Sequence, residues 1–202
     1  MKKAQNGALN IVCNSFARIL TKISKCCKIK LGRREHKGGG TVYNVLDVCR
    51  HIINYSNDHN YGISNLKLQK LLYFVQAYFV SFTSKKEPCF KDKIEAWDFG
   101  PVVPVAYHEY KRYGNTDIPY VSHYIEYNFT NFLQSKVIPF TDTVISDEDK
   151  KIIDDLIDNF SEYSTTSLVR ITHNQSPWID AQANGKNSVI TVDAIRSYFN
   201  GK

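Results

Sequence analysis

The alternation of apolar and polar residues predicts a chain built mainly from helices. Between positions 65 and 83, apolar residues lie on nearly every side of the predicted helix. A helix that is apolar all round is usually buried. Ser64 precedes this stretch, and its hydroxyl is suited to cap the first turn. We therefore expect a central helix at about 65–83, with the other helices packed around it.

Further helices are predicted on both sides of the central one. Apolar residues at helical spacing predict a first helix over 41–56. Ser146 is followed by three acidic residues, which suit the positive end of a helix dipole, so a helix should start there. We expect a short helix capped by Thr165 or Thr166, ending between His173 and Pro177. A last helix should start near Thr191.

The segment after the central helix predicts extended chain followed by a tight turn. Residues 90–97 are expected to be extended and to cross under the central helix. Gly100 permits a positive φ, and both Pro101 and Pro104 preset the entry to a helix. That helix should end at Gly114, which suits the position just past a helix C-terminus.

Residues 117–145 give a weaker pattern. Alternate residues from Val121 to Phe129 are apolar or aromatic, which indicates a strand, but Tyr124 interrupts the alternation. A short hairpin and an irregular loop both remain open here. The predicted fold class is mainly α: a compact single-domain helical bundle around a central buried helix, with a short β or extended segment and an N-terminal amphipathic extension.

The charge of the chain is divided unevenly. The chain has 202 residues and a net charge of +6, yet residues 1–40 hold ten of its 26 basic residues and one of its 20 acidic ones. The remainder is therefore mildly acidic, at −3, which does not support a nucleic-acid footprint on the folded body. No run of apolar residues is long enough for a membrane span. Five cysteines without regular spacing are typical of reduced thiols, and we expect a cytoplasmic protein.

Residues 1–41 form a basic amphipathic extension, for which three interpretations remain open. The extension could lie on an anionic membrane, contact nucleic acid, or be a non-native start. We favour the last, because residues 37–40 back-translate to a purine-rich stretch like a ribosome-binding site and Val42 can be a GTG start codon. The expected division is therefore 1–41 as the extension and 42–202 as the folded domain.

The chemistry-bearing residues do not form a recognisable catalytic motif. None of them has the spacing of a metal site, a nucleophile elbow or a phosphate loop. The sequence therefore predicts a protein that is not an enzyme and that needs no cofactor or metal. The groups considered are His51, His108, His173, Glu95, Asp98, Glu109, Cys49 and Cys89.

Two stretches carry a family resemblance. The first comprises the motifs Ile63 to Tyr73, Ile94-Glu95-Ala96-Trp97, Phe99-Gly100-Pro101-Val102-Val103-Pro104, Tyr107 and Tyr110 to Gly114. The second comprises the motifs Leu168, Thr172-His173, Pro177-Trp178, Ala181, Ile190, Ile195 and Tyr198-Phe199. Together they resemble the Panacea domain, a family that includes SocA-like antitoxins and GepA-like phage-associated proteins.

The resemblance implies a mainly helical antitoxin that neutralises a cognate protein toxin by direct binding. The SocA-like branch also delivers its toxin to a protease, and the sequence leaves open whether a protease is a partner here. Neither membrane nor nucleic acid would be required by the body. The alternative is a membrane- or DNA-associated regulator that acts through the basic N-terminal helix.

The turn after position 96 and the helix that follows it are the predicted toxin-binding surface, since aromatic residues and arginine make effective interface contacts. The expected contact residues are Trp97, Asp98, Phe99, Gly100, Pro101, His108, Tyr110, Lys111 and Arg112.

Overall fold

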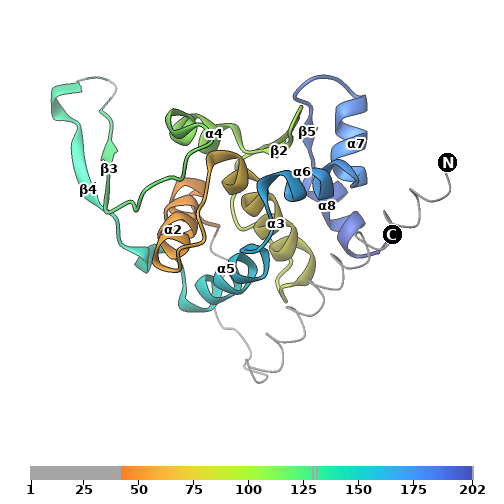
Figure 1. Cartoon of the computed structure of the whole chain (residues 1–202), viewed down its shortest axis with the longest axis horizontal. Helices are drawn as coiled ribbons and strands as arrows, with labels where there is room; N and C mark the ends of the chain where they lie inside the picture. Colours follow the sequence, from red (N-terminus) through yellow and green to blue (C-terminus); the bar gives the residue numbers. More distant parts are fainter. Residues whose placement is uncertain (1–41, 129, 131, 202) are drawn as a thin grey trace.

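The structure is a computed structural model that describes residues 42–128, 130 and 132–201. At its centre lies α3 (Asn65–Phe82), which contacts helices on several sides, as Figure 1 shows. The mainly helical fold class and the central buried helix are thus confirmed. The proposed extension over 1–41 lies outside the described residues, so the division into 1–41 and 42–202 stays a prediction.

The helices around α3 begin where the sequence offers a capping side chain. Ser146 and Thr191 accept hydrogen bonds from the backbone of α5 and α8, as expected. The cap of α6 is Ser164 rather than Thr165 or Thr166, because its hydroxyl bonds to the N–H of Ser167. The surrounding helices are α2 (Val45–Asp58), α4 (Pro104–Tyr110), α5 (Asp147–Phe160), α6 (Thr165–His173), α7 (Ser176–Ala183) and α8 (Val192–Phe199).

The sequence interpretation missed α7. Pro177 was expected to end the preceding helix, but it lies in the first turn of a new one. A proline is tolerated there because a first-turn N–H has no partner within the helix.

A small antiparallel sheet holds the predicted turn. Its strands are β1 (Ile94–Trp97), β2 (Gly100–Val102) and β5 (Val189–Ile190), in the order β2-β1-β5. Trp97 pairs with Gly100, so Asp98 and Phe99 form a two-residue turn between β1 and β2. The extended chain at 90–97 is confirmed in β1. The third strand is two residues long, too short to leave a pattern in the sequence.

A separate hairpin projects from the body, which settles the alternatives for 117–145. Strands β3 (His123–Glu126) and β4 (Lys136–Pro139) pair in antiparallel fashion, and we name residues 123–139 the arm (Figure 1). Tyr124, which interrupts the alternation, lies 3.7 Å from the guanidinium carbon of Arg50 on α2, measured to the ring centre. This contact turns the ring of Tyr124 toward the body.

Polar side chains of α3 hold the chain that leads to the turn. Gln76 accepts a hydrogen bond from the N–H of Cys89 at 2.9 Å and donates one to the carbonyl of Phe90 at 3.0 Å. Gln69 accepts one from the N–H of Val103 at 2.9 Å. Because both amides are buried, these bonds form away from water, where an unpaired backbone group costs about 1–3 kcal/mol.

Lys70 adds a buried amine to this set of contacts. Its side chain is fully buried and its Nζ donates to the carbonyl of Pro101 at 2.8 Å. Burial lowers the pKa of Lys70 to about 7, because removal from water penalises the charged amine. Gly100 lies directly over this amine with a φ of 99°.

We predict that Gly100→Ala destabilises the fold far more than Gly114→Ala. A Cβ at position 100 would lie 2.7 Å from Oγ1 of Thr172 and 2.8 Å from Nζ of Lys70. Steric overlap and the positive φ should together cost about 2–4 kcal/mol. Gly114 also has a positive φ, but a Cβ there meets nothing within 4 Å, so about 1 kcal/mol is expected. Urea unfolding measures both, and equal losses would contradict the packing described.

We also predict that the stability contributed by position 70 depends on pH. Because folding lowers the pKa of Lys70 from 10.5 to about 7, the unfolded chain binds this proton more tightly between those values. The penalty of burying the charged amine is complete below pH 7 and is relieved as the pH rises. The unfolding free energy of the wild type, minus that of Lys70→Met, should therefore increase by about 2 kcal/mol from pH 7 to pH 9. A pH-independent difference in urea unfolding would disprove this.

Candidate partner-binding surface

The turn between β1 and β2 exposes a large aromatic side chain. Phe99 is 65% exposed at the tip of the turn, and Asp98 beside it is also exposed. Gly100 and Pro101 are buried beneath them. A two-residue turn does not need a phenylalanine for its geometry, so packing of the fold does not account for this residue.

Three further rings gather next to the turn. The ring centre of Trp97 lies 4.9 Å from that of Tyr107 and 6.4 Å from that of His108, and both of those rings come from α4. Trp97 is half-buried, whereas His108 is exposed. We name the turn surface after these residues: Trp97, Asp98, Phe99, Tyr107 and His108.

The strand under the turn surface is fixed by hydrogen bonds from several directions. The indole of Trp97 donates to the Glu95 carboxylate at 2.9 Å, and the backbone carbonyl of Trp97 accepts from the indole of Trp178 at 3.0 Å. On the same helix as Trp178, Gln182 donates to the carbonyl of Ala96 at 3.1 Å. These contacts orient Trp97 before any partner arrives.

His173 supports Trp178 from α6. The two rings stack with centres 4.0 Å apart and planes 11° apart. Burial, followed by the charge of Lys70, lowers the pKa of His173, while the backbone of Asp98 opposes this shift. The ring is therefore mostly neutral at pH 7, which favours stacking in a partly buried site.

The residues predicted to bind a toxin divide into three groups. Trp97, Asp98, Phe99 and His108 lie together on the turn surface, whereas Tyr110 is 5% exposed and belongs to the core. Gly100 and Pro101 are also buried and support the turn from below. Lys111 and Arg112 are exposed in the 3₁₀ helix η1 (Lys111–Tyr113) that follows α4. Contact of this set with a toxin stays a prediction.

Sequence reasoning missed three supporting residues. Tyr107 was not among the expected contact residues, and the roles of Trp178 and Gln182 depend on α7, which was not predicted. The aromatic character of Tyr107, three residues after a proline that starts a helix, was the available signal. No local pattern indicated that α7 would reach β1.

The residues considered for catalysis do not gather at one place, although Asp98 and His108 both lie on the turn surface. His51 pairs with Asp154 at 2.8 Å, and Glu95 bonds to Trp97. Cys49 and Cys89 are buried free thiols whose pKa values are raised by burial, so both are protonated. Within residues 42–201, as far as they are described, no three His, Cys, Asp or Glu side chains gather as a metal site would need.

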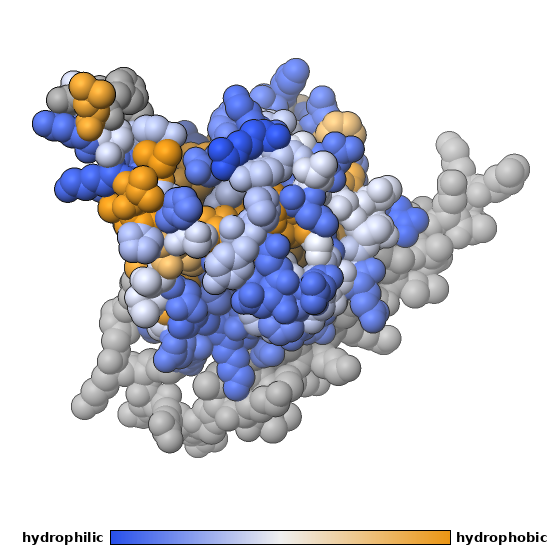
Figure 2. Space-filling view, turned by 60° about the vertical axis from the view of Figure 1, so that its left-hand side comes forward, coloured by the Kyte–Doolittle hydropathy of each residue, from blue (hydrophilic) through white to orange (hydrophobic). Residues whose placement is uncertain are grey.

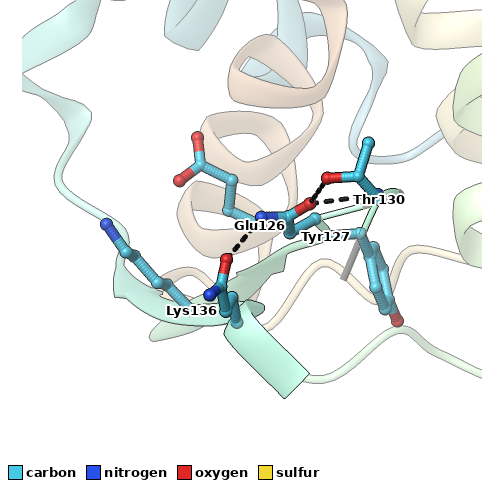
Figure 3. Close-up of a pocket in the computed structure, with 6 residues that line it drawn as sticks. Glu126, Tyr127, Thr130 and Lys136 are labelled. Atoms are coloured by element: carbon cyan, nitrogen blue, oxygen red, sulfur yellow. Dashed lines mark hydrogen bonds between the residues drawn. The ribbon is translucent and has the colours of Figure 1, made fainter. Parts of the chain in front are cut away.

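A hollow at the tip of the arm is lined by amides and hydroxyls and by the charged side chains of Glu126 and Lys136 (Figure 3). It measures about 500 Å³. Asn128 accepts from the hydroxyl of Thr130 at 2.7 Å and donates to Gln134 at 3.3 Å. Asn128, Thr130 and Gln134 thus bond to one another. None of the helices in the described part of the chain is long and apolar enough to cross a membrane.

Comparison with known proteins gives two matches. The family described as "Antitoxin SocA-like, Panacea domain" matches residues 68–179, a range that includes the turn surface and the arm. Antitoxin SocA of Caulobacter vibrioides (strain NA1000 / CB15N) is 35% identical over 124 residues, which is 61% of this chain and 61% of that protein. The chain thus aligns with less than two thirds of this relative, and no solved structure matches. Because the family match covers more than half of its residues, the chain belongs to the SocA-like family defined by the Panacea domain.

Proposed function

We propose that the protein is an antitoxin that neutralises a cognate protein toxin by direct binding. Membership of the SocA-like family supports this role, as does the similarity to Antitoxin SocA. The mechanism is stoichiometric inhibition, in which the antitoxin covers or distorts the toxin through one protein–protein interface. Such an interface buries at least about 1,200 Å² in total and needs no cofactor.

The turn surface is the proposed centre of this interface. The observation that carries the proposal is the 65% exposure of Phe99 beside a cluster of aromatic rings. Binding energy at interfaces concentrates in a few aromatic residues held near the centre of the contact. Here α3 bonds to β2 through Lys70, and α7 bonds to β1 through Gln182. A surface that is ordered before binding loses less conformational entropy when the partner arrives.

A more specific form of the proposal is that the antitoxin also delivers the bound toxin to a protease. Simple inhibition leaves the cellular level of toxin unchanged, whereas delivery to a protease shortens its half-life. Immunoblotting of a tagged toxin after synthesis is stopped, with and without the antitoxin, distinguishes the two.

We predict that Phe99→Ser weakens toxin binding without destabilising the fold. Loss of one central aromatic contact costs about 2 kcal/mol, or roughly 30-fold in Kd. The probe is the product of the gene adjacent to this one, and calorimetry with the purified pair measures the affinity. Tyr120→Ser is the matched control, because Tyr120 is also an exposed aromatic residue, at 54%, outside the turn surface. Equal affinity for wild type and Phe99→Ser would remove the turn surface from the interface.

We further predict that residues 42–202 alone restore growth to cells that express the toxin. The core residues identified in the described part of the chain, and the whole turn surface, lie within 42–202. The rival function, a membrane- or DNA-associated regulator using the basic N-terminal helix, predicts loss of activity on this truncation. A growth assay with the full chain as control decides between them. If the neighbouring gene product is harmless to cells, the antitoxin proposal itself fails.

A further inference from the structure

The turn surface combines aromatic rings with negative charge. Among the described residues, ten large apolar side chains are exposed, and six of them lie between positions 120 and 144. Figure 2 shows hydrophobic surface gathered on the side of the molecule that carries the arm. Of the turn surface, only Phe99 belongs to these ten, and Asp98 beside it is exposed. Glu95 lies on the same face of β1 as Trp97, two residues before it. Charge as well as apolar contact should therefore decide what this surface binds.

Neither carboxylate has a cationic partner within the part of the chain that the structure describes. One oxygen of Glu95 accepts the hydrogen bond from the indole of Trp97 at 2.9 Å, and no described donor bonds to its second oxygen or to the side chain of Asp98. The ion pairs that form among the described residues use other carboxylates, those of Asp47, Asp142, Asp147, Asp154 and Asp193. Two carboxylates beside the aromatic rings thus remain open to a partner.

Burial of these carboxylates in an interface is unfavourable unless the partner supplies a positive charge. Removal of an unpaired charge from water is among the most costly steps in binding. Asp98 adjoins Phe99, the residue at the proposed centre of the toxin interface, so a toxin that covers Phe99 covers Asp98 as well. Glu95 is already half-buried. An interface at the turn surface therefore requires a cation from the toxin at this place.

The three rings of the turn surface suit the same kind of partner. The centres of Trp97 and Tyr107, Trp97 and His108, and Tyr107 and His108 lie 4.9, 6.4 and 5.5 Å apart, with planes 62°, 64° and 79° apart. A cation about 4 Å from two perpendicular rings would leave their centres about 5.7 Å apart. Edge-to-face packing alone gives similar spacings. The two carboxylates are therefore what makes a cation the expected occupant.

We propose that the turn surface binds an arginine side chain of the toxin, with the guanidinium against the ring of Trp97 and its N–H groups on the carboxylates of Glu95 and Asp98. This inference rests on the proposed function and names the chemistry of the partner at the same site. Arginine fits better than lysine, because a planar guanidinium stacks on a ring while it donates to two carboxylates. A lysine ammonium is a more strongly hydrated point charge.

Titration of the full chain with N-acetyl-arginine amide, followed by NMR at the indole N–H of Trp97, tests this chemistry without the toxin. N-acetyl-citrulline amide is the matched control ligand, because its urea group has the shape of a guanidinium but no charge. The arginine ligand should bind at least about fivefold more tightly, through a cation–π contact and an exposed ion pair. Equal responses to the two ligands would overturn the inference.

The double variant Glu95→Gln, Asp98→Asn tests the same contact with the protein partner. Both changes keep the side-chain shape, and glutamine still offers an oxygen to the indole of Trp97. Calorimetry with the product of the adjacent gene should show an affinity at least about tenfold lower and a weaker dependence on salt. The control is Glu126→Gln, Glu162→Gln, which removes two exposed carboxylates outside the turn surface and should change the affinity by less than about twofold.

The variant Phe99→Ser separates failure of this inference from failure of the proposed function. If Phe99→Ser weakens toxin binding but the double variant does not, the turn surface is the interface and the arginine contact is wrong. If neither variant changes the affinity, the interface lies elsewhere and the arginine contact is overturned with it. If the wild type itself does not bind the gene product, the proposed function fails, whereas the arginine titration still tests the chemistry of the surface. Circular dichroism melting establishes that each variant remains folded.

Discussion

The hydrogen bonds from α3 to the chain between Cys89 and Val103 are the constraint on which the rest of the structure depends. Gln69, Lys70 and Gln76 lie on a helix that is otherwise almost wholly apolar, and all three are buried. Each bonds to a backbone group, and Gln69 also donates to the side chain of Asn65. An apolar residue at any of these positions would pack well but leave a backbone group unpaired. The central helix therefore forms the core and also positions the turn.

The hydrogen bonds from α3 explain why the turn surface is ordered without a ligand. Lys70 and Gly100 fit each other closely, since any side chain at position 100 would meet the amine. From the other side, Trp178 and Gln182 bond to the carbonyls of β1. The aromatic residues of the turn surface thus lie on a sheet that is hydrogen-bonded to two helices, α3 and α7. The arm is different, because its contacts with α2 are those of Asn54 with Val121 and of Arg50 with Tyr124, both near its base, while Ile125 and Val137 further along are exposed.

The sequence predicted the elements whose apolar residues recur regularly, and it failed where tertiary contacts decide. The central helix and the β1 strand were predicted because periodicity and glycine–proline signals are local. The hydrogen bonds of Gln69 and Gln76 were not predicted, because in a periodicity pattern a polar residue on a buried helix only interrupts the apolar face. The helix α7 was not predicted, because a proline such as Pro177 usually marks the end of a helix in a sequence. Of the predicted contact residues, Asp98, Phe99 and His108 are exposed, and their contact with a toxin stays a prediction. The burial of Tyr110 was not predicted, because it depends on how α4 packs against α2.

Amide hydrogen exchange at Val103 tests the central claim most directly. In the wild type this N–H is bonded to the buried amide of Gln69, so it should exchange as slowly as core amides such as that of Ile153 on α5. In Gln69→Met the Val103 amide should exchange at least about tenfold faster relative to Ile153 under identical conditions. If Val103 keeps its protection in the variant while Ile153 is unchanged, then α3 does not hold the turn by this bond, and the account is contradicted.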